Sequence, residues 1–264
     1  MEEYLEHPGG MTSASLKLIA ILTMFIDHIG ASLLEWYIVY LPAGSLKSSL
    51  RDVDMVLRCI GRLAFPLFIF LMVEGFFYTR SRAKYFGRLL LFAAISEFPF
   101  DLAFFLRVSD IQKNLWWRLD HQNVFFTLAI GFLAMWAMET LRPKEWEGKI
   151  LEGILRIALC ALAAYAACRL AKWLHTDYSW KGVLAMELAY LIRLWGRPDL
   201  EIFAILAALL FSSFMEITAI ADYLLLKAYH GEKGKSWNRW FFYVFYPGHL
   251  LLLGVIRVLW VLPK

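Results

Sequence analysis

Long apolar stretches alternate with short charged connectors along nearly the whole chain of 264 residues. A helix that crosses a bilayer needs about 20 apolar residues, and eight stretches reach or approach that length. They span residues 16–40, 56–78, 85–106, 121–140, 150–173, 179–195, 200–229 and 240–262. The pattern predicts an all-α fold, a polytopic bundle of eight transmembrane helices, or nine if the stretch 200–229 breaks near Glu216.

The segments outside these stretches are short. Residues 1–15 carry acidic side chains and a Pro-Gly-Gly break, which is typical of a short N-terminal tail and not of a cleaved signal peptide. Residues 42–54 and 107–120 are expected to be polar connectors. No connector is long enough to fold alone, so we expect residues 16–264 to form a single transmembrane domain.

Composition excludes several classes of protein. Hydrophobic residues make up 60% of the chain and charged residues 19%, against about 25% charged in ordinary globular domains. Disordered chains, secreted disulfide scaffolds and typical cytosolic enzymes do not have this balance. The three cysteines lie in apolar segments and are expected to be buried and unpaired. The bilayer is therefore the expected environment, and nucleic acid is not an expected partner.

Basic residues in short loops indicate the orientation. The densest group is Arg80, Arg82, Lys84 and Arg88, between the second and third stretches. We expect this turn to face the cytoplasm, and its arginines are also candidates for binding phosphates.

Ionisable side chains in the first stretch suggest chemistry within the membrane. Asp27 and His28 follow Lys17 by ten and eleven residues, which puts them about 15 Å along the helix. Glu35 lies two turns further on nearly the same face as His28. Submerged ionisable groups cost several kcal/mol unless they are paired or line a wet cavity, and imidazole suits proton transfer near neutral pH. The alternative is purely structural: Asp27 and His28 each form polar contacts with a neighbouring helix and take no part in chemistry.

The next two stretches add a second polar group. Arg58 and Arg62 are four residues apart, and so are Glu97 and Asp101, which have a proline between them. Residues at this spacing share a helix face. The arginines can hold an anionic ligand, or Glu74, Glu97 and Asp101 can pair with them in a purely structural network.

Other polar positions give weaker signals. His121 and Asn123 open the fourth stretch, Asp177 and Tyr178 precede the sixth, and His249 interrupts the last. Helix ends at an interface explain most of these equally well. The spacing of His and carboxylate residues does not support a metal site, and no motif of a soluble enzyme is present.

Several blocks of residues, in order along the chain, resemble the TraX family. They are Asp27-His-Ile-Gly30, Arg58-x-x-Gly-Arg-x-Ala-Phe-Pro66, Val73-Glu-Gly-Phe76, Thr79-Arg80, Ser96-Glu-x-Pro-Phe-Asp101, His121-Gln-Asn-Val-Phe-Phe-Thr127, Asp177-Tyr178 with Gly182-Val-Leu184, and Phe245-Tyr-Pro-x-His-Leu250. The first half of the chain carries the more specific blocks.

This resemblance implies an integral-membrane acyltransferase of the bacterial inner membrane that uses acetyl-CoA, since the founding member acetylates the amino terminus of a conjugative pilin. The acceptor here would be an amine or a hydroxyl, on a peptide N-terminus or a small molecule. His28 would be the general base or the acyl carrier, and Asp27 or Glu35 would orient it.

The remaining candidate residues take supporting roles in that hypothesis. Arg58, Arg62, Arg80 and Arg82 would bind the donor's phosphates, and His121 and Asn123 would stabilise the oxyanion. Substrate contacts would come from Glu74, Glu97, Asp101, Tyr178 and His249. A proton-coupled transporter that uses the same buried charges is the alternative, and a non-catalytic membrane scaffold is a third.

Overall fold

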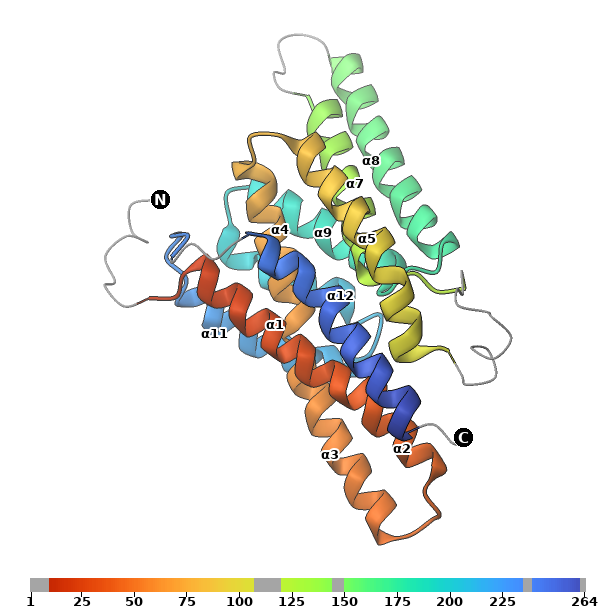
Figure 1. The fold of residues 1–264 in the computed structure, drawn as a ribbon. Helices are drawn as coiled ribbons and strands as arrows, with labels where there is room; N and C mark the ends of the chain where they lie inside the picture. Colours follow the sequence, from red (N-terminus) through yellow and green to blue (C-terminus); the bar gives the residue numbers. More distant parts are fainter. Residues whose placement is uncertain (1–9, 107–119, 144–149, 235–238, 262–264) are drawn as a thin grey trace.

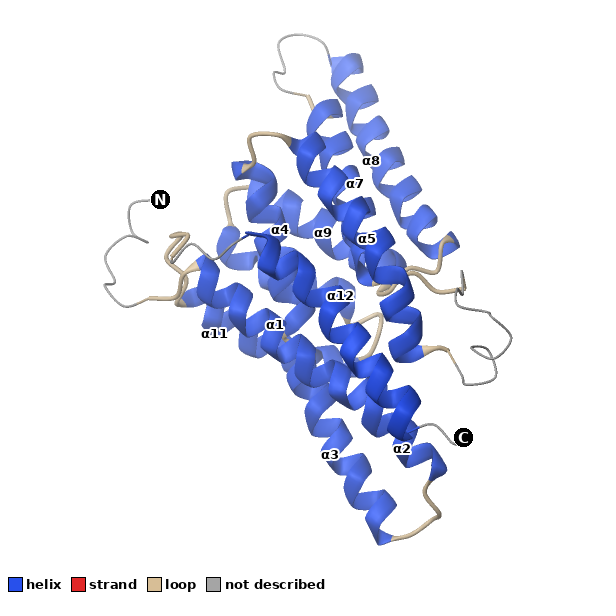
Figure 2. Ribbon diagram, viewed as in Figure 1, coloured by secondary structure: helices blue, strands red, loops and turns tan. Residues whose placement is uncertain are grey.

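The computed structural model describes residues 10–106, 120–143, 150–234 and 239–261, and these residues contain helices and no strand (Figures 1 and 2). The expected tail mostly precedes this part of the chain, and most of the expected 107–120 connector lies outside it. The helical elements are α1 (Ser13–Ile29), η1 (Gly30–Leu34), α2 (Glu35–Tyr40), α3 (Ser45–Gly61), α4 (Ala64–Tyr78), α5 (Arg82–Phe104), α7 (Val124–Leu141), α8 (Ile150–Trp173), α9 (Ser179–Leu194), η2 (Pro198–Leu200), α10 (Glu201–Leu209), η3 (Phe214–Ala221), α11 (Asp222–Lys227), α12 (Arg239–Ile256) and η4 (Arg257–Val261).

Helix α4 forms the centre of the bundle because, apart from Glu74, nearly all of its side chains are apolar. Leu67, Ile69, Val73 and Phe76 are each 0% exposed, and α4 packs against α1, α7, α9 and α10. Helix α8 lies at the periphery against α7 and α9 (Figure 1). Most of its apolar side chains are exposed, so this face is suited to lipid.

Several expected boundaries agree with the structure. Helix α8 has the same bounds as the fifth apolar stretch. Helix α9 begins where the sixth stretch begins and ends one residue earlier than that stretch. Residues 16–40 form the almost continuous run of α1, a π-helical turn (η1) and α2. The expected connector 42–54 is different, because it is helical from Ser45 onward as the first half of α3. Its leucines and valines recur at helical spacing among Ser, Lys, Arg and Asp, so the segment is an amphipathic helix despite its polarity.

The stretch 200–229 is broken, and not one long helix. Helix α10 ends at Leu209, and the 3₁₀ segment η3 begins at Phe214. Ser213 caps the start of η3, because its side chain accepts a hydrogen bond from Met215 N. Nine residues of α10 cover about 14 Å, less than half of a hydrocarbon core. The break also brings Glu216 inward, where it is 2% exposed.

Five of the described helical segments are long and apolar enough to cross a membrane: 13–40, 45–78, 124–141, 150–173 and 240–260. Helix α5 has sufficient length, but it carries Arg82, Lys84, Arg88, Glu97 and Asp101. Helix α9 is short, with 16 residues. The fold is all-helical with several apolar helices, as expected of a membrane protein, whereas the expected count of eight or nine transmembrane helices is not reached by these criteria.

Candidate functional site

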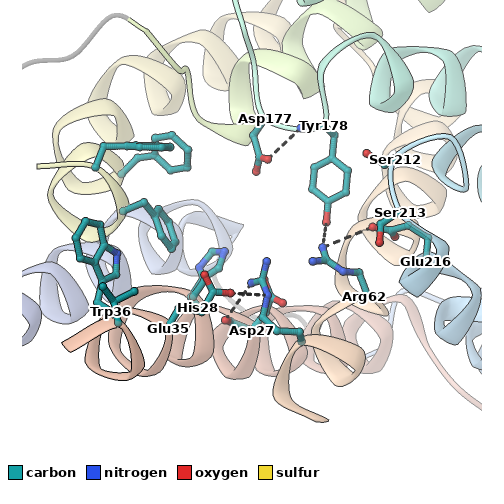
Figure 3. Close-up of a pocket in the computed structure, with 16 residues that line it drawn as sticks. Asp27, His28, Glu35, Trp36, Arg62, Asp177, Tyr178, Ser212, Ser213 and Glu216 are labelled. Carbon is teal, nitrogen blue, oxygen red and sulfur yellow. Dashed lines mark hydrogen bonds and ion pairs between the residues drawn. The ribbon is translucent and has the colours of Figure 1, made fainter. Parts of the chain in front are cut away.

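A cavity of about 680 Å³ opens beside the middle of the first helical run (Figure 3). Its wall includes the last turn of α5, the segment before α9, and the turn between α10 and η3. The 16 lining residues are Asp27, His28, Ala31, Glu35, Trp36, Val39, Arg58, Arg62, Phe100, Phe104, Phe105, Asp177, Tyr178, Ser212, Ser213 and Glu216. The lining is therefore polar along α1 and α3 and aromatic along α5.

Arg58 joins the two carboxylates of the first helical run. Its Nη1 donates to Asp27 Oδ2 at 2.7 Å, and its Nε lies 3.4 Å from Glu35 Oε1. This geometry requires a close approach of α1 and α3 at Gly61, where an added Cβ would lie 2.2 Å from Asp27 Cβ. Glycine at this position therefore lets α3 bring Arg58 to Asp27.

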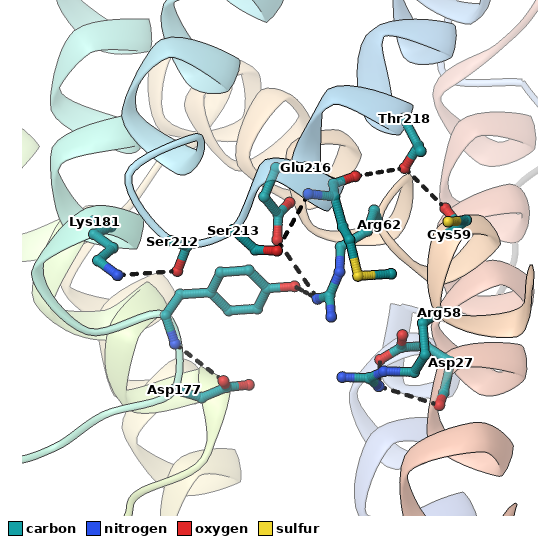
Figure 4. A network of polar contacts seen from close by, with 12 residues as sticks. Asp27, Arg58, Cys59, Arg62, Asp177, Lys181, Ser212, Ser213, Glu216 and Thr218 are labelled. Carbon is teal, nitrogen blue, oxygen red and sulfur yellow. Dashed lines mark hydrogen bonds and ion pairs between the residues drawn. The ribbon is translucent and has the colours of Figure 1, made fainter. Parts of the chain in front are cut away.

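Arg62, one turn after Arg58, holds the opposite wall (Figure 4). Its Nη1 lies 3.5 Å from Glu216 Oε1 and donates to Tyr178 Oη at 3.4 Å. The Tyr178 ring stacks on Phe65 with centroids 3.7 Å apart. Arg62 thus connects α3 to the broken segment after α10 and to the segment before α9.

The segment before α9 is conformationally strained. His175, Tyr178 and Ser179 all have positive φ, between 50° and 59°, a region that side-chain-bearing residues seldom occupy. Asp177 accepts a hydrogen bond from Tyr178 N at 3.0 Å, and its carboxylate points into the cavity (Figure 3). Burial raises the pKa of Asp177 to about 6, the Tyr178 N–H opposes this rise, and the Asp27 charge adds to it.

His28 contacts a second imidazole below the cavity floor. His28 Nδ1 and His249 Nε2 are 2.7 Å apart, and His249 Nδ1 is 2.7 Å from the carbonyl oxygen of Phe245. His249 is 6% exposed and does not line the cavity. Among the described residues, His28 is therefore the one imidazole in the cavity wall.

The cavity is richer in acidic than in basic groups. Its lining has four carboxylates, from Asp27, Glu35, Asp177 and Glu216, and two guanidiniums. Asp27 Oδ1 and Glu216 Oε2 are buried, and neither has a hydrogen-bond partner among the residues that the structure describes. An unsatisfied buried polar atom costs about 1–3 kcal/mol or more, so the site is suited to a polar or cationic guest.

The structure brings together six of the residues that the sequence singled out: Asp27, His28, Glu35, Arg58, Arg62 and Tyr178. His249 joins them through its bond to His28. Asp27 and Glu35, which were expected to orient the imidazole, bond instead to Arg58.

The other acidic candidates lie outside the lining. Glu97 accepts from Asn123 Nδ2 at 2.6 Å, and Glu74 accepts from Tyr229 Oη at 2.6 Å. Asp101 is fully buried in α5. The interpretation that Glu74 and Glu97 pair with the arginines is wrong, because both have these other partners and nearer carboxylates take their place.

Four further candidates are also outside the cavity lining. Asn123 uses both amide hydrogens, on Glu97 and on the carbonyl of Ala93, and is 0% exposed. His121 is exposed and stacks on Phe105. Arg82 begins α5, whose last turn lines the cavity, so it lies about 30 Å away along the helix, and Arg80 belongs to the same turn.

Two cavity carboxylates were not identified as site residues from the sequence. Glu216 was considered only as a possible break, although an acidic residue in the middle of a mostly apolar stretch is costly in lipid and is therefore a functional signal. Asp177 was interpreted as a solvated helix end. Its position in the site depends on the left-handed turn at Tyr178, which sequence periodicity does not report.

Comparison with known proteins assigns the chain to a family. The chain matches the TraX protein family over residues 12–257. It is 32% identical over 256 residues to the probable fimbrial assembly protein FimC, serogroup H1, of Dichelobacter nodosus, which covers 90% of this chain and 92% of that protein. No solved structure matches the chain. With the cavity residues inside the matched range, the chain belongs to the TraX family.

Proposed function

We propose that this protein is a membrane-embedded acyltransferase that moves an acetyl group from acetyl-CoA to an amine or hydroxyl, with His28 as the general base. The observation that carries the proposal is an imidazole in a carboxylate-rich cavity bounded by apolar helices. The TraX resemblance supplies the reaction class. The bacterial inner membrane is the location that this family relationship supports.

The proposed step needs one proton acceptor in the cavity. His28 takes the proton from the acceptor's N–H or O–H as the nitrogen or oxygen attacks the acetyl carbonyl carbon. The new bond to that carbon forms, the carbon–sulfur bond breaks, and the CoA thiolate leaves with the electron pair. The proton on His28 then neutralises the thiolate. Removal of such a base typically costs about 10²–10⁴-fold in rate.

The charge balance assigns different tasks to the other side chains. Arg58 and Arg62 are each engaged by carboxylates, so a phosphate in the cavity would have to displace Asp27, Glu35 or Glu216. We infer that the thioester end of the donor enters the cavity and its phosphates stay outside. The arginines then hold the carboxylates in position, and Asp177 faces the acceptor.

The charges that line the cavity indicate which kind of acceptor it can bind. Four carboxylates against two guanidiniums favour binding of an ammonium group, which gives one proton to a cavity carboxylate such as Asp177 before its nitrogen attacks. The name of the D. nodosus relative concerns fimbrial assembly, which supports the N-terminus of a surface-fibre subunit as the acceptor to test first.

The test is mass spectrometry of the purified protein in nanodiscs, incubated with acetyl-CoA and a panel of peptides and small amines. We expect an acceptor 42 Da heavier (acetyl replaces hydrogen), and we expect His28→Gln to lower turnover about 100-fold or more. His175→Asn is the matched control, because His175 is exposed and Asn tolerates positive φ.

Two results would contradict the proposal. Full turnover by a folded His28→Gln variant would remove His28 from the chemistry. Absence of any acetyl product or CoA release, together with proton-coupled flux of a solute in liposomes, would instead support the transporter alternative.

A further inference from the structure

The carbonyl group at the end of the His28–His249 contact determines where the hydrogens lie. The carbonyl oxygen of Phe245 can only accept, so His249 Nδ1, 2.7 Å away, must carry a hydrogen. A neutral imidazole has one N–H, which leaves a lone pair on His249 Nε2. That nitrogen is 2.7 Å from His28 Nδ1, so His28 Nδ1 must be the donor between them.

The surroundings of His249 favour its neutral form. It is 6% exposed, and its ring contacts are Phe25, Phe245, Tyr246 and His28. Each of these partners is aromatic and uncharged when His28 is neutral. A cationic His249 would be an uncompensated charge among them, which is costly in a protein interior.

We propose that His249 is the positioning residue of the site, holding His28 in the tautomer that has a hydrogen on Nδ1 and a lone pair on Nε2. His249 itself does not line the cavity, whereas His28 does. Because Nδ1 is committed to His249, Nε2 is the His28 nitrogen left to accept a proton from a substrate. His249 takes the part that a buried carboxylate takes in a Ser-His-Asp triad, but without a charge.

This inference rests on the proposed function and adds a role to it. When His28 takes up a proton, its Nδ1–H bond to His249 strengthens, because hydrogen bonds from charged donors are stronger. The cation that forms during transfer is then stabilised without a buried negative charge.

The direct test is ¹⁵N NMR of the full-length protein labelled at histidine, because protonated and unprotonated ring nitrogens have well-separated shifts. The His28 signals are identified by their loss in His28→Gln. We expect a protonated Nδ1 and an unprotonated Nε2 in wild type. The opposite pattern would overturn the proposal. This NMR measurement does not require a variant of His249.

Two substitutions then separate positioning from packing. In His249→Gln the amide can donate to Phe245 O and accept from His28 Nδ1, so it should keep the tautomer and keep kcat within about threefold. His249→Leu removes the acceptor. We expect mixed tautomers of His28 and a kcat that falls about tenfold, with KM within about twofold of wild type. Equal losses in both variants would contradict the positioning role.

The two proposals can fail separately. A wild-type spectrum with the expected tautomer, in a protein that transfers no acetyl group, would leave the positioning intact and refute the enzyme. Acetyl transfer by a protein whose His28 carries its hydrogen on Nε2 would do the reverse.

Discussion

Single side chains in this cavity depend on one another for partners, and Arg58 shows the dependence most clearly. Its guanidinium is 21% exposed and contacts Asp27, which is 14% exposed, and Glu35. Removing one member of a largely buried pair leaves the other uncompensated, and this usually costs more than the pair contributes. The charges of the site are therefore stable only as a set.

Arg58→Gln should lower stability by about 2–3 kcal/mol, because Asp27 and Glu35 lose their shared cation. Thermal unfolding in detergent measures the effect. Arg197→Gln is the matched control, since Arg197 pairs with Asp199 on the exposed surface, where ion pairs contribute little. Similar melting temperatures for Arg58→Gln and wild type would mean that the carboxylates find other partners.

Asp177 lies outside the helices, and its raised pKa should make the free energy of unfolding depend on pH. Its folded-state pKa of about 6 is above the ordinary value of 3.8 for an aspartate side chain, so the folded protein binds this proton more tightly than the unfolded chain. The folded state is then penalised above pH 6, and the penalty disappears as the pH falls below about 4. Asp177→Asn keeps an oxygen for Tyr178 N and should be more stable than wild type at pH 7. The gain in melting temperature should shrink progressively from pH 7 to pH 4, and a gain independent of pH would contradict this assignment.

At the scale of elements, the position of α3 against α1 determines the site. The contact at Gly61 leaves no space for a side chain, because the nearest atom to an added Cβ is Asp27 Cβ, beside the α1 backbone. A flexible side chain could move away, whereas a Cβ atom cannot do so without moving its helix.

Gly61→Ala should therefore separate α3 from α1, lengthen the Arg58–Asp27 contact, and lower both the melting temperature and the transfer rate. Gly87→Ala is the control within another helix: an added Cβ there meets nothing within 4 Å, and alanine favours helix by about 0.5–1 kcal/mol. Equal behaviour of the two variants in thermal unfolding would contradict the close-approach interpretation.

The sequence predicted elements where the apolar pattern alone sets them, as for α8. It also grouped Asp27, His28, Glu35, Arg58 and Arg62, since all lie within two neighbouring stretches and their cost in lipid is visible in the chain. The helix within 42–54 was missed because an amphipathic helix outside the bilayer was taken for a polar connector.

The long-range partners of the site could not be predicted in the same way. Glu216 reaches Arg62 from 154 positions later in the chain, and His249 reaches His28 from 221 positions later. Neither pairing has a local signal, because each is produced by packing of the whole bundle: α12 lies against α1, and η3 lies against α3.

On the scale of the whole molecule, the cavity and the basic turn lie at opposite ends of the bundle. The last turn of α5 lines the cavity, whereas its first residue, Arg82, belongs to the basic turn. Helix α4 repeats this arrangement, with Arg62 just before its start and Arg80 just after its end. Helix α3 extends from the bundle on the cavity side (Figure 1). The 34-residue segment 45–78 covers about 50 Å at 1.5 Å per residue, so about 20 Å of it projects beyond a 30 Å hydrocarbon core.

Together with the positive-inside rule, this geometry predicts on which side of the membrane the cavity and the start of α3 lie. If the basic turn faces the cytoplasm, the cavity is nearer the opposite face and the start of α3 projects from that face. On a background without Cys59, Cys160 and Cys168, Ser48→Cys should react with a membrane-impermeant maleimide in intact spheroplasts, and Arg80→Cys should react only after permeabilisation. Labelling of both from one side would mean that α3 and α4 do not cross the bilayer together. Labelling in the inverse order would keep the fold but turn the cavity, and with it the acceptor's route, to the cytoplasm.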